Sequence, residues 1–95
     1  MKIIRHLRIM GRVQGVGYRA ALRTEAESRG IAGWVRNRRD GSVEALVQGS
    51  PEAVETILDW VRHGPPGARV TGIDVQPAVG DSDRSYSGFD CLPTA

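Results

Sequence analysis

The stretch that decides the fold is residues 33–47, which read GWVRNRRDGSVEALV. Its two ends, residues 33–36 and 43–47, carry Trp, Val and Leu side chains that suit β-strands. Between them, residues 37–41 include an Asp-Gly pair, which is a strong signal for a tight turn. We therefore expect a β-hairpin in the middle of the chain.

The segment before this hairpin predicts a strand, a glycine-bearing loop and a helix. Residues 2–10 are rich in Ile and Leu that share one parity, as in a strand. Residues 11–17 form the loop and contain three glycines. From residue 18 to residue 29 the apolar side chains recur at helical spacing, and Gly30 follows where a C-terminal cap is expected.

The segment after the hairpin predicts a second helix and further strands. Ser50 suits an N-cap and Pro51 the first helical position, and the helix should end near residue 63. Residues 70–75 predict a fourth strand, and residues 89–92 a short final strand after a polar loop over residues 80–87. Because β-α-β crossovers are right-handed, the order β-α-β-β-α-β predicts a ferredoxin-like α+β sandwich, an antiparallel sheet with both helices on one face.

Length and composition indicate one soluble domain over residues 1–95. Hydrophobic residues make up 40% of the chain and charged residues 25%, which is typical of a globular protein. There is no apolar run long enough to span a bilayer and no signal peptide, and Cys91 is the only cysteine, so no internal disulfide can form. We expect a cytoplasmic monomer without a membrane partner, in which Cys91 is a small buried residue of the last strand.

The distribution of charge points to a small anion as the ligand. The net charge of +2 is too small to indicate a nucleic-acid partner, but twelve of the thirteen cations are arginine. The loop over residues 11–17 joins a strand to a helix, where backbone N–H groups and the helix dipole favour an anion. Arg19, in the first turn of that helix, could hold two phosphoryl oxygens at once. A nucleotide-binding P-loop pattern is absent from the sequence.

Two segments resemble the signatures of the acylphosphatase family. The first comprises Gly11, Val13-Gln14-Gly15-Val16 and Tyr18-Arg19, and the second comprises Gly33-Trp34-Val35-Arg36-Asn37, Gly41, Val43 and Gly49. At about one chance in 20 per specified position, two ordered matches of this length are not a coincidence. The resemblance covers nearly the whole chain. It implies a ferredoxin-like sandwich that hydrolyses acyl phosphates, with Tyr18 standing where phenylalanine is common.

The resemblance also implies the roles of individual residues. Arg19 matches the phosphate-binding arginine of the family and Asn37 its water-orienting asparagine. The backbone cradle for the phosphoryl group corresponds to Gln14, Gly15, Val16, Gly17 and Tyr18. Without the resemblance, Asn37 would be interpreted as a turn residue that tolerates a left-handed backbone.

The expected reaction is the attack of a positioned water on an acyl phosphate, giving a carboxylate and inorganic phosphate. A carboxylate leaves without needing a proton, so the reaction can proceed without a general acid and by positioning alone. We therefore expect no cofactor and no metal.

Two other classes of function remain as alternatives. An RNA-binding module can share this fold, but residues 43–47 lack the basic and aromatic side chains that such a module needs. A carrier domain, like the acylphosphatase-like segment of larger carbamoyl-handling proteins, is the second. Because the chain ends at Ala95, we expect a free enzyme instead.

Overall fold

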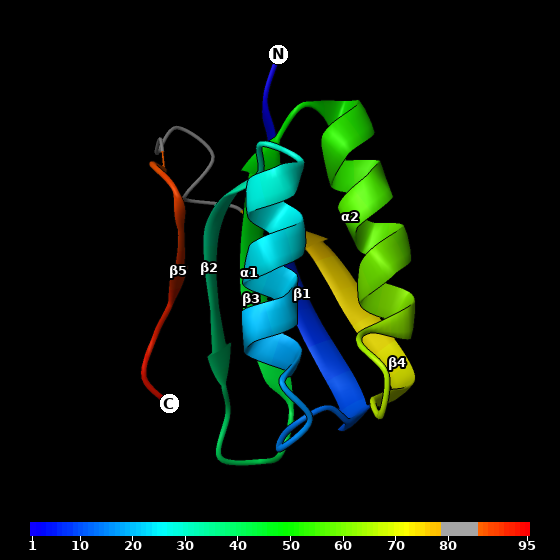
Figure 1. The fold of residues 1–95 in the computed structure, drawn as a ribbon. Coiled ribbons are helices and arrows are strands. Elements are labelled where there is room, and N and C mark those ends of the chain that lie inside the picture. The colour runs from blue at the N-terminus through cyan, green and yellow to red at the C-terminus, as the bar shows by residue number, and fades with distance from the viewer. Residues whose placement is uncertain (79–85) are drawn as a thin grey trace.

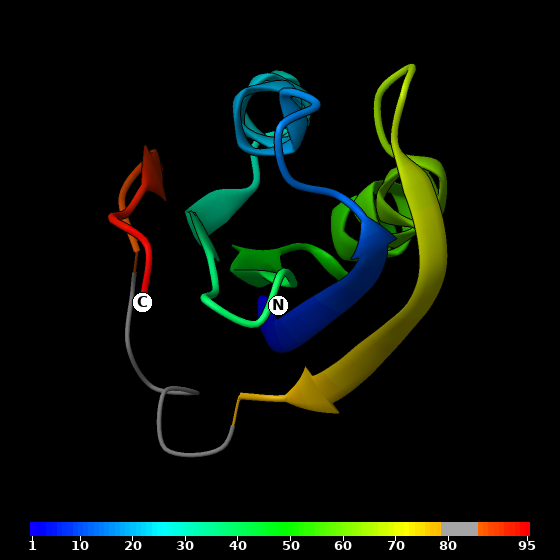
Figure 2. The same ribbon diagram turned by 90° about the horizontal axis from the view of Figure 1, so that it is seen from below.

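The computed structural model describes residues 1–78 and 86–95. Its elements are β1 (Ile3–Arg12), α1 (Tyr18–Ser28), β2 (Ala32–Asn37), β3 (Val43–Gly49), α2 (Pro51–His63), β4 (Arg69–Pro77) and β5 (Phe89–Cys91). Both helices lie against one face of the sheet (Figure 1, Figure 2). The expected ferredoxin-like α+β fold is therefore confirmed, while all but the last two residues of the expected polar loop 80–87 lie outside the described residues.

The sheet has the strand order β4-β1-β3-β2-β5. The β1–β3, β1–β4 and β2–β3 pairs are antiparallel, as expected. The pair formed by β2 and β5 is parallel, with Val35 opposite Cys91, so the sheet is mixed rather than wholly antiparallel. The reason is the direction of the chain: β4 runs opposite to β2, and the chain reverses before β5, so β5 runs with β2.

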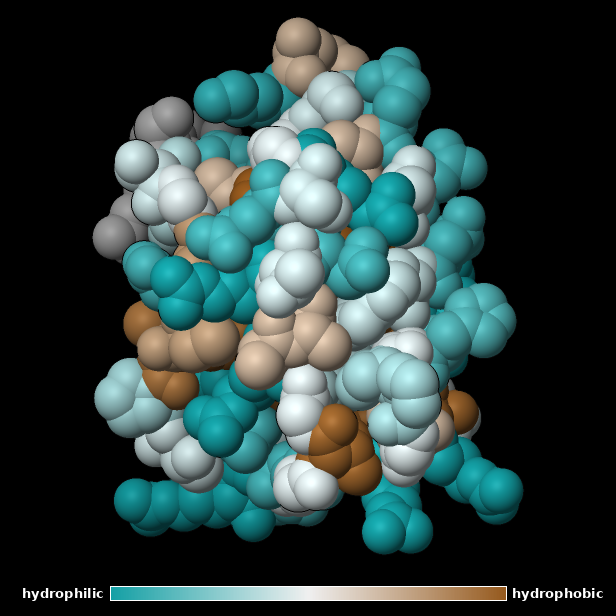
Figure 3. All heavy atoms as spheres, in the orientation of Figure 1, coloured by the Kyte–Doolittle hydropathy of each residue, from teal (hydrophilic) through white to brown (hydrophobic). Residues whose placement is uncertain are grey.

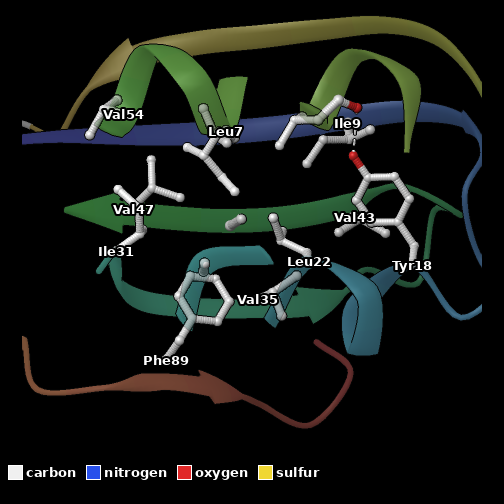
Figure 4. Packing of buried hydrophobic residues seen from close by; sticks show 14 of the residues in the cluster. Leu7, Ile9, Tyr18, Leu22, Ile31, Val35, Val43, Val47, Val54 and Phe89 are labelled. Atoms are coloured by element: carbon white, nitrogen blue, oxygen red, sulfur yellow. Dashed lines mark hydrogen bonds between the residues drawn. The ribbon is translucent and has the colours of Figure 1, made fainter. Parts of the chain in front are cut away.

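The core lies between the sheet and the two helices (Figure 4). Alternate side chains of the central strands point towards the helices and are fully buried, and each helix contributes one apolar stripe. They include Leu7 and Ile9 of β1, Val35 of β2, Val43 and Val47 of β3, Tyr18 and Leu22 of α1, and Val54 and Ile57 of α2. Since burying one such side chain is worth about 1.5–3 kcal/mol, this layer is the main source of stability.

The expected start of α2 is confirmed by its cap, while α1 ends at Ser28, one residue earlier than expected. The Ser50 hydroxyl accepts a hydrogen bond from the Ala53 N–H at 3.1 Å, with Pro51 as the first residue of α2. At the end of α1, Gly30 has a φ of 68° and its N–H donates to the Glu27 carbonyl at 3.3 Å. Its left-handed backbone is one that glycine adopts without steric cost, so the chain can turn from α1 into β2.

The surface on the helix side of the molecule is largely hydrophilic, with only scattered hydrophobic residues (Figure 3). None of the helices in the described part of the chain has the length and apolar character needed to cross a membrane.

The Tyr18 side chain ties the start of α1 to the end of α2. Tyr18 is 2% exposed, its hydroxyl donates to the Val61 carbonyl at 2.7 Å (Figure 4), and burial raises the pKa of the phenol well above its ordinary value. Val61 lies in the last turn of α2, and the residue four positions later is Pro65, which has no N–H to offer its carbonyl. The tyrosine hydroxyl therefore satisfies a helix carbonyl that the backbone leaves without a donor.

We expect Tyr18→Phe to lower the free energy of unfolding by about 1–2 kcal/mol, because it leaves the buried Val61 carbonyl without its donor. Urea denaturation followed by circular dichroism measures this change. Thr24→Val is the matched control, since it removes an exposed hydrogen bond to the Ala20 carbonyl on the same helix. It should cost less than about 0.5 kcal/mol. Equal losses in the two variants would show that the Tyr18 hydroxyl has no special role.

Candidate active site

A cavity of about 340 Å³ opens where β1 leads into α1. In Figure 1 the N-terminus of α1, the β2–β3 turn and the C-terminal segment lie at the same end of the molecule. The cavity is lined by Val13, Gln14, Gly15, Gly17, Tyr18, Arg19, Ala20, Asn37 and Cys91. The fold therefore brings together six of the seven predicted site residues, since only Val16 is absent from the wall. The side chain of Val16 packs partly against the core instead.

The loop before α1 lines this cavity and carries backbone N–H groups that are left for a ligand. Gly15 and Gly17 have φ values of 75° and 77°, a left-handed backbone that other residues rarely adopt. Gly17 is the N-cap of α1, and no side chain caps this helix start. Among the described residues, no acceptor takes the N–H groups of residues 15–19. Because a helix N-terminus also carries a partial positive charge, the loop forms a cradle suited to an anion.

Among the described residues in the wall of the cavity, Arg19 carries the one full positive charge. It is the second residue of α1, is half-buried, and lines the same cavity as the helix start. Within the described part of the chain, its guanidinium has neither an ion pair nor a hydrogen bond. Other arginines, such as Arg36 and Arg38, are paired with a carboxylate. Arg19 therefore has all of its donors available for an anion.

Asn37 lies across the cavity from α1 as the last residue of β2. It pairs with Val43 in the sheet, and its carbonyl accepts a hydrogen bond from the Ala95 N–H at 3.0 Å. The interpretation of Asn37 as a left-handed turn residue is wrong, because no described residue other than glycine has a positive φ. The turn begins at residue 38 rather than at residue 37, because Asn37 is still part of β2 and its backbone is bonded to Val43 and Ala95.

The Gln14 side chain lies between the cradle and the β2–β3 hairpin. Its Nε2 donates to the carbonyls of Arg38 at 2.7 Å and Ser42 at 2.8 Å. Both donors of its amide are therefore used within the protein, so Gln14 can offer an anion its backbone only. Tyr18 can likewise offer an anion only its backbone N–H, because its side chain points into the core.

Cys91 was not expected in this site, and the prediction that it is buried is wrong. Its side chain is exposed, it lines the cavity, and its Sγ lies 3.9 Å from the Arg19 carbonyl. The reason is that β5 is an edge strand whose described partner is β2 alone, so only Phe89 at its start is covered by the core. Phe89 and Cys91 share a face of the strand, so the two-residue period alone would bury both, and no local pattern in the sequence placed Cys91 at the cavity.

Two carboxylates hold the hairpin that carries Asn37. Hydrogen bonds from the Ser42 hydroxyl and N–H lower the pKa of Asp40 to about 2, and Asp40 also pairs with Arg8. Burial would raise the pKa of Glu44, but hydrogen bonds from Arg36 and His6 outweigh it, and this pKa lies below its ordinary value. Both groups are therefore ionised at neutral pH.

The comparisons with known proteins agree with this geometry. Residues 5–91 match the family model described as Acylphosphatase. An acylphosphatase from Azoarcus sp. (strain BH72) is 54% identical over 90 residues, which cover 95% of this chain and 89% of the relative. One from Thermococcus kodakarensis is 54% identical over 77 residues, covering 80% of this chain and 85% of the relative.

A solved structure gives the same result for the fold. The crystal structure of acylphosphatase from Bacillus subtilis superposes with a TM-score of 0.89 and 37% sequence identity, and the match covers 97% of this chain and 99% of that one. The family model, the relatives and the fold all lead to one assignment, and this chain belongs to the acylphosphatase family.

Proposed function

We propose that this chain hydrolyses acyl phosphates to a carboxylate and inorganic phosphate, with Arg19 binding the phosphoryl group and Asn37 orienting the attacking water. One observation carries the proposal: the Arg19 guanidinium and Asn37 line the same cavity as the uncapped start of α1. Family membership supports the substrate class.

The proposed role of the cradle is to bind the phosphoryl oxygens. A guanidinium can donate two parallel hydrogen bonds to two oxygens, and the N–H groups of residues 15–19 can donate to the others. In a loose phosphoryl-transfer transition state, charge is spread over these oxygens. Donors that are already in place stabilise this charge without reorganising, which lowers the barrier.

The proposed role of Asn37 is to hold the water in line with the bond that breaks. Its side-chain amide has both an acceptor and a donor, so it can bind a water hydrogen and fix the orientation of the oxygen. In a loose transition state the water has lost little of its proton, and positioning replaces a general base. The bond between phosphorus and the acyl oxygen breaks as the new bond to water forms, and the carboxylate leaves with the electron pair.

We propose that the reaction needs no metal and no cofactor. The Arg19 charge and the N–H groups of the cradle supply the electrostatic stabilisation that a metal ion gives in other phosphoryl-transfer sites. The leaving carboxylate is stable without protonation, so an acid is not required either.

We also propose that the enzyme accepts substrates with many different acyl groups. Among the described residues that line the cavity, Arg19 is the one that carries a charge, so the others offer no charge to select a charged acyl group. We also propose that the protein acts as a monomer in the cytoplasm, since both Arg19 and Asn37 line the cavity within a single chain.

Phosphate release from benzoyl phosphate, an aryl acyl phosphate, tests the proposed function. A phosphate monoester, p-nitrophenyl phosphate, is the control, because its leaving group is much poorer. We expect release from the acyl phosphate only. Activity on neither substrate would favour a binding or carrier role, and equal activity on both would contradict the proposed substrate class.

A further expected result is that kcat is independent of any enzymic ionisation between about pH 5 and 8, even with excess EDTA. Arg19 stays protonated and Asn37 does not ionise in this range. The lowered pKa values of Asp40 and Glu44 keep both carboxylates charged throughout it, so the hairpin does not change its charge through them.

This result is checked by measuring kcat against pH on benzoyl phosphate for the unmodified protein and for His6→Gln and His63→Gln. Neither histidine lines the cavity. A bell-shaped profile that becomes flat in one histidine variant, or activity that returns only with added metal, would contradict the proposed mechanism.

A further inference from the structure

The Gln14 side chain forms a bridge between the two halves of the candidate site. Its Nε2 lies 2.7 Å from the Arg38 carbonyl and 2.8 Å from the Ser42 carbonyl, which are 24 and 28 residues further along the chain. Both partners are acceptors only, so the NH2 group and not the oxygen of the amide must face them. Each of its two hydrogens therefore has its own carbonyl.

These two carbonyls lie at the two ends of the β2–β3 turn. The Arg38 N–H donates to the Ser42 carbonyl at 2.8 Å, and the Gly41 N–H donates to the Arg38 carbonyl at 3.1 Å. A carbonyl oxygen has two lone pairs, so each of them can accept the hairpin bond and the bond from Gln14 together. Gln14 therefore binds the closed form of the turn and holds it at a fixed distance from the cradle.

Asn37 directly precedes this turn. Its side-chain amide makes no hydrogen bond with another described residue, so the direction of the amide depends on the backbone that carries it. That backbone is held on one side by the Ala95 N–H and on the other by the Arg38 carbonyl bound to Gln14. A shift of the turn relative to the cradle would move Asn37 relative to the phosphoryl group.

We infer that Gln14 is a positioning residue for hydrolysis: its side chain fixes the hairpin to the phosphate cradle and so sets the distance between the water on Asn37 and the phosphoryl group. This inference rests on the proposed function. Gln14 acts through Asn37 and does not bind the substrate with its side chain. A misplacement of 1 Å can cost about 100-fold in rate. Loss of the bridge should therefore lower kcat while the cradle itself stays intact.

The test is Gln14→Met, which keeps the length of an unbranched side chain, stays neutral and removes both donors. We expect kcat on benzoyl phosphate to fall by at least about tenfold, while the inhibition constant of inorganic phosphate stays within about twofold. Gln14→Asn, which keeps the amide but is one methylene shorter, should also lose kcat and serves if the first variant does not fold.

Two matched controls separate positioning from a general loss of stability. Gln76→Met makes the same substitution at an exposed position of β4 and should leave both constants unchanged. Ile57→Val removes one methylene from the core and should lower the thermal midpoint without the selective loss of kcat.

Three results would overturn the inference while the unmodified protein remains active. One is an unchanged kcat in both Gln14 variants, and a second is a parallel loss of phosphate affinity, which would place Gln14 in the cradle. The third is an equal loss of kcat in Ile57→Val, which would make the effect one of stability. An inactive unmodified protein would instead contradict the proposed function.

Discussion

Arg19→Ala should lose phosphate affinity and turnover together. Of the described residues in the wall of the cavity, Arg19 carries the one full charge and the only side chain that can hold two phosphoryl oxygens, and the substitution removes both. Loss of such a bidentate, charge-assisted contact should cost on the order of 3 kcal/mol or more in transition-state stabilisation, or about 150-fold in kcat/KM. Steady-state kinetics on benzoyl phosphate, with inorganic phosphate as competitor, measure both effects.

Two variants control this result. Arg23→Ala makes the same change one turn further along α1, where the arginine is exposed and pairs with Glu27 at 3.7 Å. It should leave kcat/KM within about twofold, because exposed ion pairs contribute little. Arg19→Lys should restore only part of the activity, since an ammonium cannot reproduce the planar fork. If phosphate competes at unchanged affinity in Arg19→Ala, the assignment of Arg19 is wrong.

Asn37→Ala should abolish turnover and leave the binding of inorganic phosphate nearly intact. The proposed partner of the Asn37 amide is the water and not the phosphoryl group, so ground-state binding and chemistry should separate. We expect a loss in kcat of about 100-fold or more, as for other groups that act in the transition state alone. Phosphate affinity is measured by isothermal titration calorimetry alongside kcat.

The fold of the hairpin must be checked in the same variant, because Asn37 also closes β2. Its backbone pairs with Val43 and Ala95 do not involve the side chain, so the substitution should leave them in place. Unchanged circular dichroism and thermal midpoint would show this. A variant that loses phosphate binding and turnover together would instead assign Asn37 a structural role in the hairpin.

The fold could be predicted from the sequence wherever local signals and periodicity agree. The Asp-Gly turn, the Ser50 cap and the apolar spacing are properties of neighbouring residues, and the structure confirms the elements that they predict. The parallel pairing of β5 could not be predicted, because it depends on where the chain returns after β4. A three-residue strand also gives too short a pattern to indicate its partner.

The sequence indicated which residue types form the site, but not the contacts that bring distant segments together there. The glycine loop and its arginine gave a local signal for an anion, and Asn37 came from the resemblance to the family. Cys91, the hydrogen bond from Ala95 to Asn37 and the bridge from Gln14 join segments that are far apart in the sequence. Such contacts follow from the tertiary arrangement of strand ends, for which a single sequence carries no periodic signal.

The central claim is that a water held in this cavity attacks phosphorus. Hydrolysis of benzoyl phosphate in water enriched in oxygen-18, followed by mass spectrometry of both products, tests it most directly. If Asn37 places water in line with the leaving carboxylate, the label should appear in inorganic phosphate and be absent from benzoate, because the bond between phosphorus and the acyl oxygen breaks. Label in the benzoate would mean attack on the acyl carbon and would contradict the proposed roles of Arg19 and Asn37.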